Sequence, residues 1–110
     1  MIYFIAQGEE FIKIGYGMAP EERLSQLQTG NPNDLRLIAA FAGSKEDEGR
    51  VHEIFGNIHV RGEWFRFDSR LTDFIHWMVE FSDIEESLRR TDAEITRSEA
   101  EIIKFPVTCA

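Results

Sequence analysis

The chain has 110 residues, 43% of them hydrophobic, which is enough for one hydrophobic core and too little for two. Its formal net charge of −8 argues against tight, non-specific wrapping of nucleic acid, because that mode of binding depends on neutralised phosphates. A single cysteine, Cys109, excludes an internal disulfide and leaves a disulfide between two chains as the minor alternative. The lack of a basic leader and of any run of ~20 apolar residues predicts a cytoplasmic protein without a membrane span.

The chain begins with a predicted β-hairpin. Residues 2–4 and 11–14 are rich in β-branched and aromatic side chains, and residues 8–10 separate the two runs. Gly15 and Gly17 follow, where a tight turn needs a positive φ or a close backbone approach that only a residue without Cβ allows. We therefore expect two antiparallel strands and then a sharp bend.

A short helix is predicted from about Pro20 to Thr29. Proline suits the first helical turn because it lacks an amide proton, the acidic residues after it favour the positive end of the helix dipole, and residues 30–32 end the helix. Arg23 stands four residues before Leu27, so its guanidinium borders the apolar stripe of this helix. Arg23 is therefore expected to be held in position.

A third strand and a second helix are predicted next. Apolar side chains alternate at positions 35, 37, 39 and 41 within residues 34–43, which is typical of a strand. Ser44 and Asp47 then resemble a capping box at the start of a helix. On this helix Glu48 and His52 lie on the same side at a spacing of four.

The following segment, residues 60–67, is predicted to be a short strand or an extended piece, with a turn at Gly62 and a large apolar load that includes Trp64. A further helix is expected after it, capped by Ser69. Its apolar side chains over residues 71–81 keep the spacing of a surface that packs on a core.

The pattern changes after residue 82, which divides the chain into a compact domain, 1–82, and a helical extension with a short tail, 83–110. A thin heptad seam runs through the extension at Ile84, Leu88, Thr91, Ile95, Ser98 and Ile102. So narrow a stripe cannot fold alone at this length, so it either lies on the domain or pairs with another copy to form a homodimer through residues 84–103. Together these elements predict an α+β fold, with a three-stranded antiparallel sheet flanked by helices and an extra C-terminal amphipathic helix.

Several arginines could give this acidic chain a local basic groove. Those that recur through one region are Arg50, Arg61, Arg66 and Arg70. They form such a groove if they gather on one face with Lys13 and Arg23; the alternative is that they are ordinary solvated side chains.

Polar residues at the edges of the predicted buried stripes converge if the helices cover the sheet: Tyr3, Lys13, Arg23, Glu48 and His52. Hydrolysis of a phosphodiester needs such a set. Arg23 would hold a phosphate oxygen and offset the charge that develops in the transition state. Glu48 would bind a single divalent cation that prefers oxygen, such as Mg²⁺. Tyr3, or a water that it orients, would handle the proton of the nucleophile.

Each of these residues also has a purely structural interpretation. Tyr3 can pack with its hydroxyl at the rim of the core, Arg23 and Glu48 can form an ion pair, and His52 can be a satisfied helix histidine. No zinc site competes, because one cysteine and three scattered histidines do not make a ligand set.

Several short motifs occur in an order typical of one family: Tyr3 in IYF, Lys13-Ile14-Gly15, Arg23 ten residues after Lys13, the run RLSQLQTGNP, Glu48 four residues before His52, Phe55, and Gly62-Glu63-Trp64-Phe65. Over about residues 1–80 this ordered set resembles the GIY-YIG nuclease superfamily, and more closely its branch of phage-encoded and meiotically up-regulated DNA-binding domains. The resemblance implies a three-stranded antiparallel sheet flanked by helices. It also implies metal-dependent cutting of one DNA strand, with Tyr3, Arg23 and Glu48 in the active site.

The chain departs from the family pattern at two places. Lys13 stands where the family has a second tyrosine, a change that this branch tolerates, and Tyr16 is an alternative source of a hydroxyl. The late asparagine of many such nucleases has no match. The segment there holds Glu63, which is either a second carboxylate near the metal or a partner of Arg23 or Arg61.

Two functions from different classes follow. The first is an endonuclease of the GIY-YIG type that acts on DNA with Mg²⁺ or Mn²⁺. The second is a domain of the same fold that binds nucleic acid or a protein without cutting. The predicted contacts to nucleic acid are Lys13, Tyr16, Arg23, Arg61 and Trp64.

Overall fold

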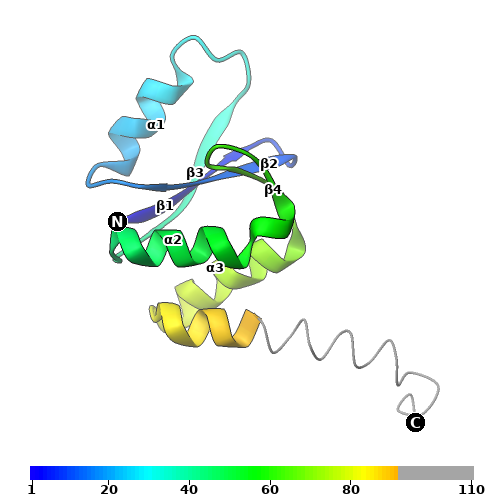
Figure 1. Ribbon diagram of the computed structural model, residues 1–110. Helices are drawn as coiled ribbons and strands as arrows, with labels where there is room; N and C mark the ends of the chain where they lie inside the picture. Colours follow the sequence, from blue (N-terminus) through cyan, green and yellow to red (C-terminus); the bar gives the residue numbers. More distant parts are fainter. Residues whose placement is uncertain (92–110) are drawn as a thin grey trace, which may run out of the picture.

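The computed structural model of the chain describes residues 1–91, which fold into an antiparallel sheet with helices on both of its faces (Figure 1). The α+β class is as predicted. The sheet has five strands in the order β3-β1-β2-β5-β4. Their bounds are β1 Ile2–Gln7, β2 Phe11–Tyr16, β3 Leu35–Phe41, β4 His59–Arg61 and β5 Trp64–Arg66.

The prediction of three strands is wrong, because the segment at residues 59–66 is a hairpin rather than one extended piece. Gly62 has a φ of 55°, a left-handed conformation that glycine adopts without a steric penalty, and it lies in the turn between β4 and β5. β5 then pairs with the edge of β2, where Trp64 stands opposite Lys13. Each new strand has only three residues, so the sequence holds too little alternation to reveal it.

The helices are α1 (Pro20–Gln28), α2 (Lys45–Ile54), the short 3-10 helix η1 (Gly56–Ile58) and α3 (Ser69–Phe81). The predicted capping box is present at α2: the Ser44 hydroxyl accepts the N–H of Asp47, and the Asp47 carboxylate accepts the N–H of Ser44, both at 3.0 Å. At α3 the cap is Asp68 rather than Ser69, because the Asp68 carboxylate accepts the N–H of Arg70 at 2.9 Å.

The alternation predicted for β3 breaks at a β-bulge. Leu37 pairs with Ile5 and Ala39 pairs with Phe4, so Ile38 has no partner between them. Leu37 consequently faces α1, whereas Ala39 packs into the core on the opposite face. A strict alternation over positions 35–41 is therefore wrong.

The main core lies between the sheet and helices α2 and α3. The ring centroid of Phe74 lies 6.2 Å from that of Phe4 and 5.7 Å from that of Phe55, and all three residues are at most 1% exposed. A smaller cluster on the other face packs Tyr3 and Ile5 against α1. Because side chains alternate along β1, Tyr3 lies on the opposite face from Phe4.

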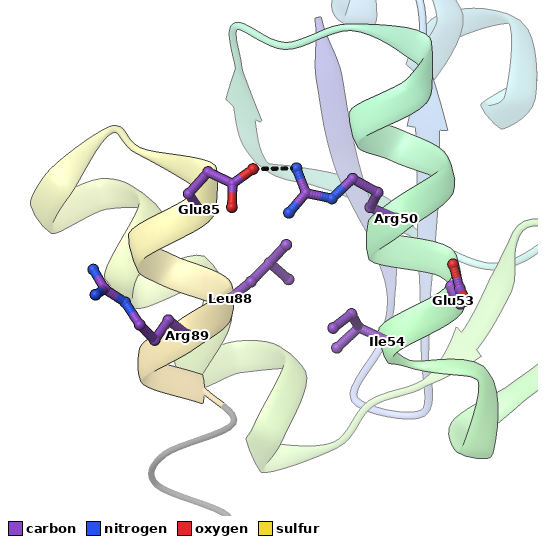
Figure 2. A pocket seen from close by; sticks show the side chains of 6 residues that line it. All are labelled: Arg50, Glu53, Ile54, Glu85, Leu88 and Arg89. Atoms are coloured by element: carbon purple, nitrogen blue, oxygen red, sulfur yellow. Dashed lines mark hydrogen bonds and ion pairs between the residues drawn. The ribbon is translucent and has the colours of Figure 1, made fainter.

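Residues 84–91 are helical and pack against α2 (Figure 2). Leu88 is 5% exposed within the main core, Thr91 is fully buried, and Glu85 pairs with Arg50 of α2 at 2.5 Å. An open groove of about 580 Å³ runs between the two helices. The part of the predicted seam that the structure describes is thus used within the chain rather than left for a second copy, and the rest of the seam lies outside the described residues.

Within residues 1–91, every helix is too short or too polar to cross a membrane. Cys109 lies outside the described residues.

Candidate functional site

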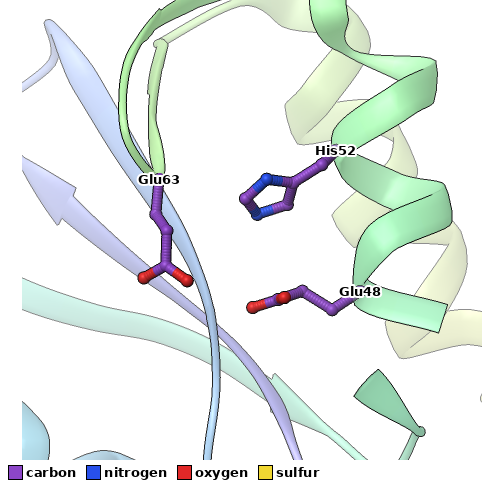
Figure 3. A group of neighbouring side chains, drawn as sticks. All are labelled: Glu48, His52 and Glu63. Carbon is purple, nitrogen blue, oxygen red and sulfur yellow. The ribbon is translucent and has the colours of Figure 1, made fainter. Parts of the chain in front are cut away.

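The candidate site lies where β5 leaves the edge of β2. The two strands pair from Phe11 to Lys13, and the last backbone bond runs from the Ile14 N–H to the Glu63 carbonyl at 2.9 Å. Just beyond it, the Ile14 carbonyl is 2.9 Å from Nε2 of His52 on α2. The residue that leads into β5 and the helix α2 therefore meet across the end of β2, and their side chains face one another (Figure 3).

Three potential ligand groups gather at this point: Glu48, His52 and Glu63. One donor atom from each lies within 4.8 Å of the other two. Glu48 is 7% exposed, and its Oε2 is buried without a hydrogen-bond partner among the described residues. Burial, and then the charge of Glu63, raise the pKa of the Glu48 carboxyl. A buried carboxylate oxygen beside a second carboxylate is unfavourable unless a cation shares it.

Lys13 neutralises one of these carboxylates. Its Nζ lies 2.8 Å from Glu63 Oε1 and 5.7 Å from the centroid of the Trp64 ring, and the residue is 7% exposed. Glu63 thus pairs with Lys13, and the predicted pairing with Arg23 or Arg61 is wrong. The pair could have been predicted from the register of the β4–β5 hairpin against β2, because this register places Glu63 beside the end of β2.

Tyr3 reaches the site because the residue opposite it is a glycine. Tyr3 pairs with Gly15 across β1 and β2, and a Cβ on Gly15 would lie only 2.6 Å from the tyrosine hydroxyl oxygen and closer still to two ring carbons. The ring therefore lies across the bare backbone of Gly15, with its hydroxyl end over β2. Of the two reasons predicted for glycine here, close approach is the correct one, because the φ of Gly15 is not positive.

The Tyr3 hydroxyl is electrostatically coupled to three other segments. Tyr3 is 3% exposed, and burial is the largest cause that raises its pKa; the charge of Glu63 and, more weakly, that of Glu48 act in the same direction. Hydrogen bonding and charge from Arg23 act in the opposite direction. Because the net effect is a raised pKa, the phenol keeps its proton at neutral pH.

Arg23 is the exposed member of the group. Its Nη1 donates to Gln26 Oε1 at 3.3 Å, and α1 is seated on the sheet through Leu24 and Leu27. Among residues 1–91 no carboxylate forms an ion pair with Arg23, so the structural alternative of a pair with Glu48 is wrong. The guanidinium therefore remains available to an anionic ligand.

His52 is fixed from two sides. Its Nε2 bonds to the Ile14 carbonyl, and its ring meets Phe65 edge-on at 4.9 Å between centroids. A carbonyl only accepts hydrogen bonds, so Nε2 carries the proton and the lone pair of a neutral imidazole is on Nδ1. His52 is thus the satisfied helix histidine of the structural interpretation, and it still offers one nitrogen to a ligand.

The predicted residues come together from four elements, β1, β2, α1 and α2: they are Tyr3, Lys13, Arg23, Glu48 and His52.

The sequence family defined by the T5orf172 domain matches residues 1–90. The chain belongs to the T5orf172 domain family. No curated protein and no solved structure shows significant similarity to it.

Membership in the T5orf172 family supports the predicted resemblance in part. It agrees with the phage-associated branch and with a nucleic-acid-related function, whereas the GIY-YIG family itself is not matched.

Three other predicted contacts to nucleic acid lie outside the cluster in this T5orf172 domain: Arg61, Trp64 and Tyr16. Arg61 and Trp64 line an open pocket of about 270 Å³ together with Gln7, Phe11 and Val60. Tyr16, at the end of β2, is 37% exposed. Arg61 and Trp64 thus form one exposed surface beside β5, and Tyr16 is not part of their pocket.

Two of the six basic residues predicted to form a groove have other partners. Arg50 pairs with Glu85, and Arg70 donates to the Ile54 carbonyl while its guanidinium lies 4.9 Å from the centroid of the Phe55 ring. Both arginines are committed to packing among the helices.

Proposed function

We propose that this T5orf172 domain is a metal-dependent endonuclease that hydrolyses a phosphodiester bond in one strand of DNA. The observation that carries the proposal is the Glu48 carboxylate, which is buried, has an oxygen without a hydrogen-bond partner among residues 1–91, and lies in one electrostatic network with Tyr3 and Arg23. Perturbed titratable groups gathered in this way are typical of functional sites.

The donor set fits a divalent cation. A hard ion such as Mg²⁺ or Mn²⁺ takes carboxylate oxygens, and the unpaired Oε2 of Glu48 supplies one. When bound, such an ion stabilises negative charge on the phosphate and on the leaving oxygen. Glu48 and Glu63, whose charges repel, would be stabilised by a cation held there.

Arg23 binds the scissile phosphate in this mechanism. It is exposed, unpaired by any carboxylate in the described part of the chain, and close enough to Tyr3 to influence the pKa of the phenol. A planar guanidinium donates two parallel hydrogen bonds to phosphate oxygens and opposes the charge that accumulates in the transition state.

Tyr3 orients the attacking water. Since its phenol keeps its proton, it acts through hydrogen bonding rather than as a phenolate base. In the reaction, the oxygen of water bonds to phosphorus while the bond from phosphorus to the leaving sugar oxygen breaks. The water releases one proton and the sugar oxygen takes up one, so protons balance. Lys13, on β2 and paired with Glu63, reduces the negative charge that the phosphate meets at this site.

A second function is favoured by a different observation. The pocket lined by Arg61 and Trp64 is separate from the acidic cluster, and its aromatic and cationic walls suit a stacked base or a protein side chain. A non-catalytic domain that binds nucleic acid or a protein would use this pocket and leave Glu48 without a role.

Nicking of supercoiled plasmid in the presence of Mn²⁺ separates the two functions. The wild type should convert supercoiled to open circular DNA, and Arg23→Ala and Glu48→Gln should each be slower by about 10²-fold or more. Arg36→Ala is the matched control, because Arg36 is an exposed arginine of β3 that bonds to the Gly8 carbonyl. Equal traces of nicking in all four proteins would indicate contamination and favour the binding domain.

A further inference from the structure

We infer that Glu48, His52 and Glu63 together form a three-ligand site for a first-row transition metal ion, with Mn²⁺ preferred over Mg²⁺. This inference rests on the proposed function, which assigns the ion to Glu48 alone, and it adds two ligands and a metal preference.

The distances suit a single ion. Ligand atoms bound at ~2.1 Å to one ion are at most ~4.2 Å apart. The donor atoms of the three side chains already lie within 4.8 Å of one another, so movements of about 1 Å through side-chain torsions bring them onto one ion. Figure 3 shows the side chains of Glu48 and His52 directed from α2 toward that of Glu63.

One further observation indicates that the site expects a ligand. Glu48 is more than nine-tenths buried, and its unpartnered oxygen belongs to this cluster. In Figure 3 the His52 nitrogen directed toward the two carboxylates is Nε2, which is the nitrogen that bonds to the Ile14 carbonyl. Nε2 binds the ion by exchanging this bond for the metal, and the proton of the imidazole is then on Nδ1.

The charges also balance. Two carboxylates and a neutral imidazole carry a charge of −2, and the ammonium of Lys13 offsets one unit through its pair with Glu63. A divalent cation matches the full charge of the two carboxylates when it takes the place of Lys13 beside Glu63, so the ion and Lys13 compete for that carboxylate. Lys13 therefore sets the affinity of the site as well as its charge.

The imidazole decides the metal. Mg²⁺ is bound by oxygen ligands and keeps several waters. Nitrogen ligands instead favour first-row transition ions, whose binding affinities increase from Mn²⁺ toward Cu²⁺. Two carboxylates and one imidazole are consequently better suited to Mn²⁺ than to Mg²⁺.

Titration calorimetry with MnCl₂ or MgCl₂ and no DNA tests the inference. We expect one Mn²⁺ per chain, bound at least about tenfold more tightly than Mg²⁺, and a loss of about tenfold or more in Mn²⁺ affinity for His52→Gln and for Glu63→Gln. His52→Gln keeps an amide N–H for the Ile14 carbonyl. Lys13→Met should strengthen Mn²⁺ binding, because it removes the competitor. Glu53→Gln is the control, since Glu53 is an exposed carboxylate on the same helix.

A readout on the wild type alone guards against variants that fold poorly. Pulsed electron paramagnetic resonance of bound Mn²⁺ should show coupling to a directly bound ¹⁴N nucleus. Two results would overturn the inference and leave the proposed function intact. The first is the absence of that coupling. The second is wild-type Mn²⁺ affinity in both His52→Gln and Glu63→Gln, while Glu48→Gln no longer binds the ion. Mn²⁺ bound by all of these variants, combined with no plasmid nicking by the wild type, would overturn both.

Discussion

Gly15 shows how one residue positions the candidate site. The Tyr3 ring occupies the place where a side chain at position 15 would begin, with its hydroxyl oxygen 2.6 Å from where a Cβ would lie. Tyr3 can therefore extend from β1 over β2 toward Glu63 and Arg23. The sequence predicted either a positive φ or a close backbone approach at this glycine, and it did not indicate which residue makes the approach.

Gly15→Ala should lower the free energy of unfolding by about 1–3 kcal/mol, because the added methyl group overlaps the buried ring. Chemical denaturation measures the change. In a Tyr3→Ala background the same substitution should have less than half of that effect, since the ring is gone. An equal loss in both backgrounds would show that the ring is not what excludes a side chain at Gly15.

Glu48 is the residue where stability and function conflict. Burial and the charge of Glu63 raise the pKa of this carboxyl in the folded state above its unfolded value, so the folded protein binds more protons than the unfolded chain between the two values. The contribution of Glu48 to stability therefore declines as pH rises through that interval and stays unfavourable above it. Functional sites commonly retain such unfavourable groups.

In metal-free buffer, the wild type should lose stability relative to Glu48→Gln as pH rises from about 4.5 toward 7, because glutamine stays neutral. Thermal unfolding of both proteins across this range checks the sign. Addition of Mn²⁺ at neutral pH should stabilise the wild type and leave Glu48→Gln unchanged. A difference between the two proteins that is constant with pH would contradict the assigned ionisation.

At the scale of elements, prediction succeeded where local signals are strong. The first hairpin, α1 and the capping box of α2 follow from β-branched runs, a proline at the first helical position and the Ser44–Asp47 pair. The β4–β5 hairpin was not predicted, because three-residue strands are too short to show a periodic pattern. Without that hairpin, the ion pair between Glu63 and Lys13 could not be predicted either. The bulge at Ile38 was missed because it depends on pairing with β1.

Burial of Leu88 within the main core implies that the helical segment at 84–91 is part of the domain. Leu88→Ala should lower the free energy of unfolding by about 2–5 kcal/mol, as expected for a leucine lost from a core. The midpoint of unfolding should not depend on protein concentration. A midpoint that rises with concentration in the wild type, together with a small effect of Leu88→Ala, would instead indicate that these residues serve a contact between copies.

At the scale of the whole molecule, the net charge of −8 limits how DNA can be held. Arg50 and Arg70 are committed to helix packing and Lys13 to Glu63. Affinity for DNA is then expected to depend on Arg23, Arg61 and a bound metal rather than on a broad basic surface. The composition of the sequence predicts this limit, but only the fold shows which arginines already have partners within the protein.

The central claim is that Arg23 and Glu48, from α1 and α2, act on the same phosphate. A double-mutant cycle on the single-turnover rate of plasmid nicking with saturating Mn²⁺ tests it most directly. The account predicts losses of about 10²-fold or more for Arg23→Ala and for Glu48→Gln, and a loss for the double variant that is clearly smaller than the product of the two. Losses that multiply fully, or a wild-type rate in either single variant, would contradict it.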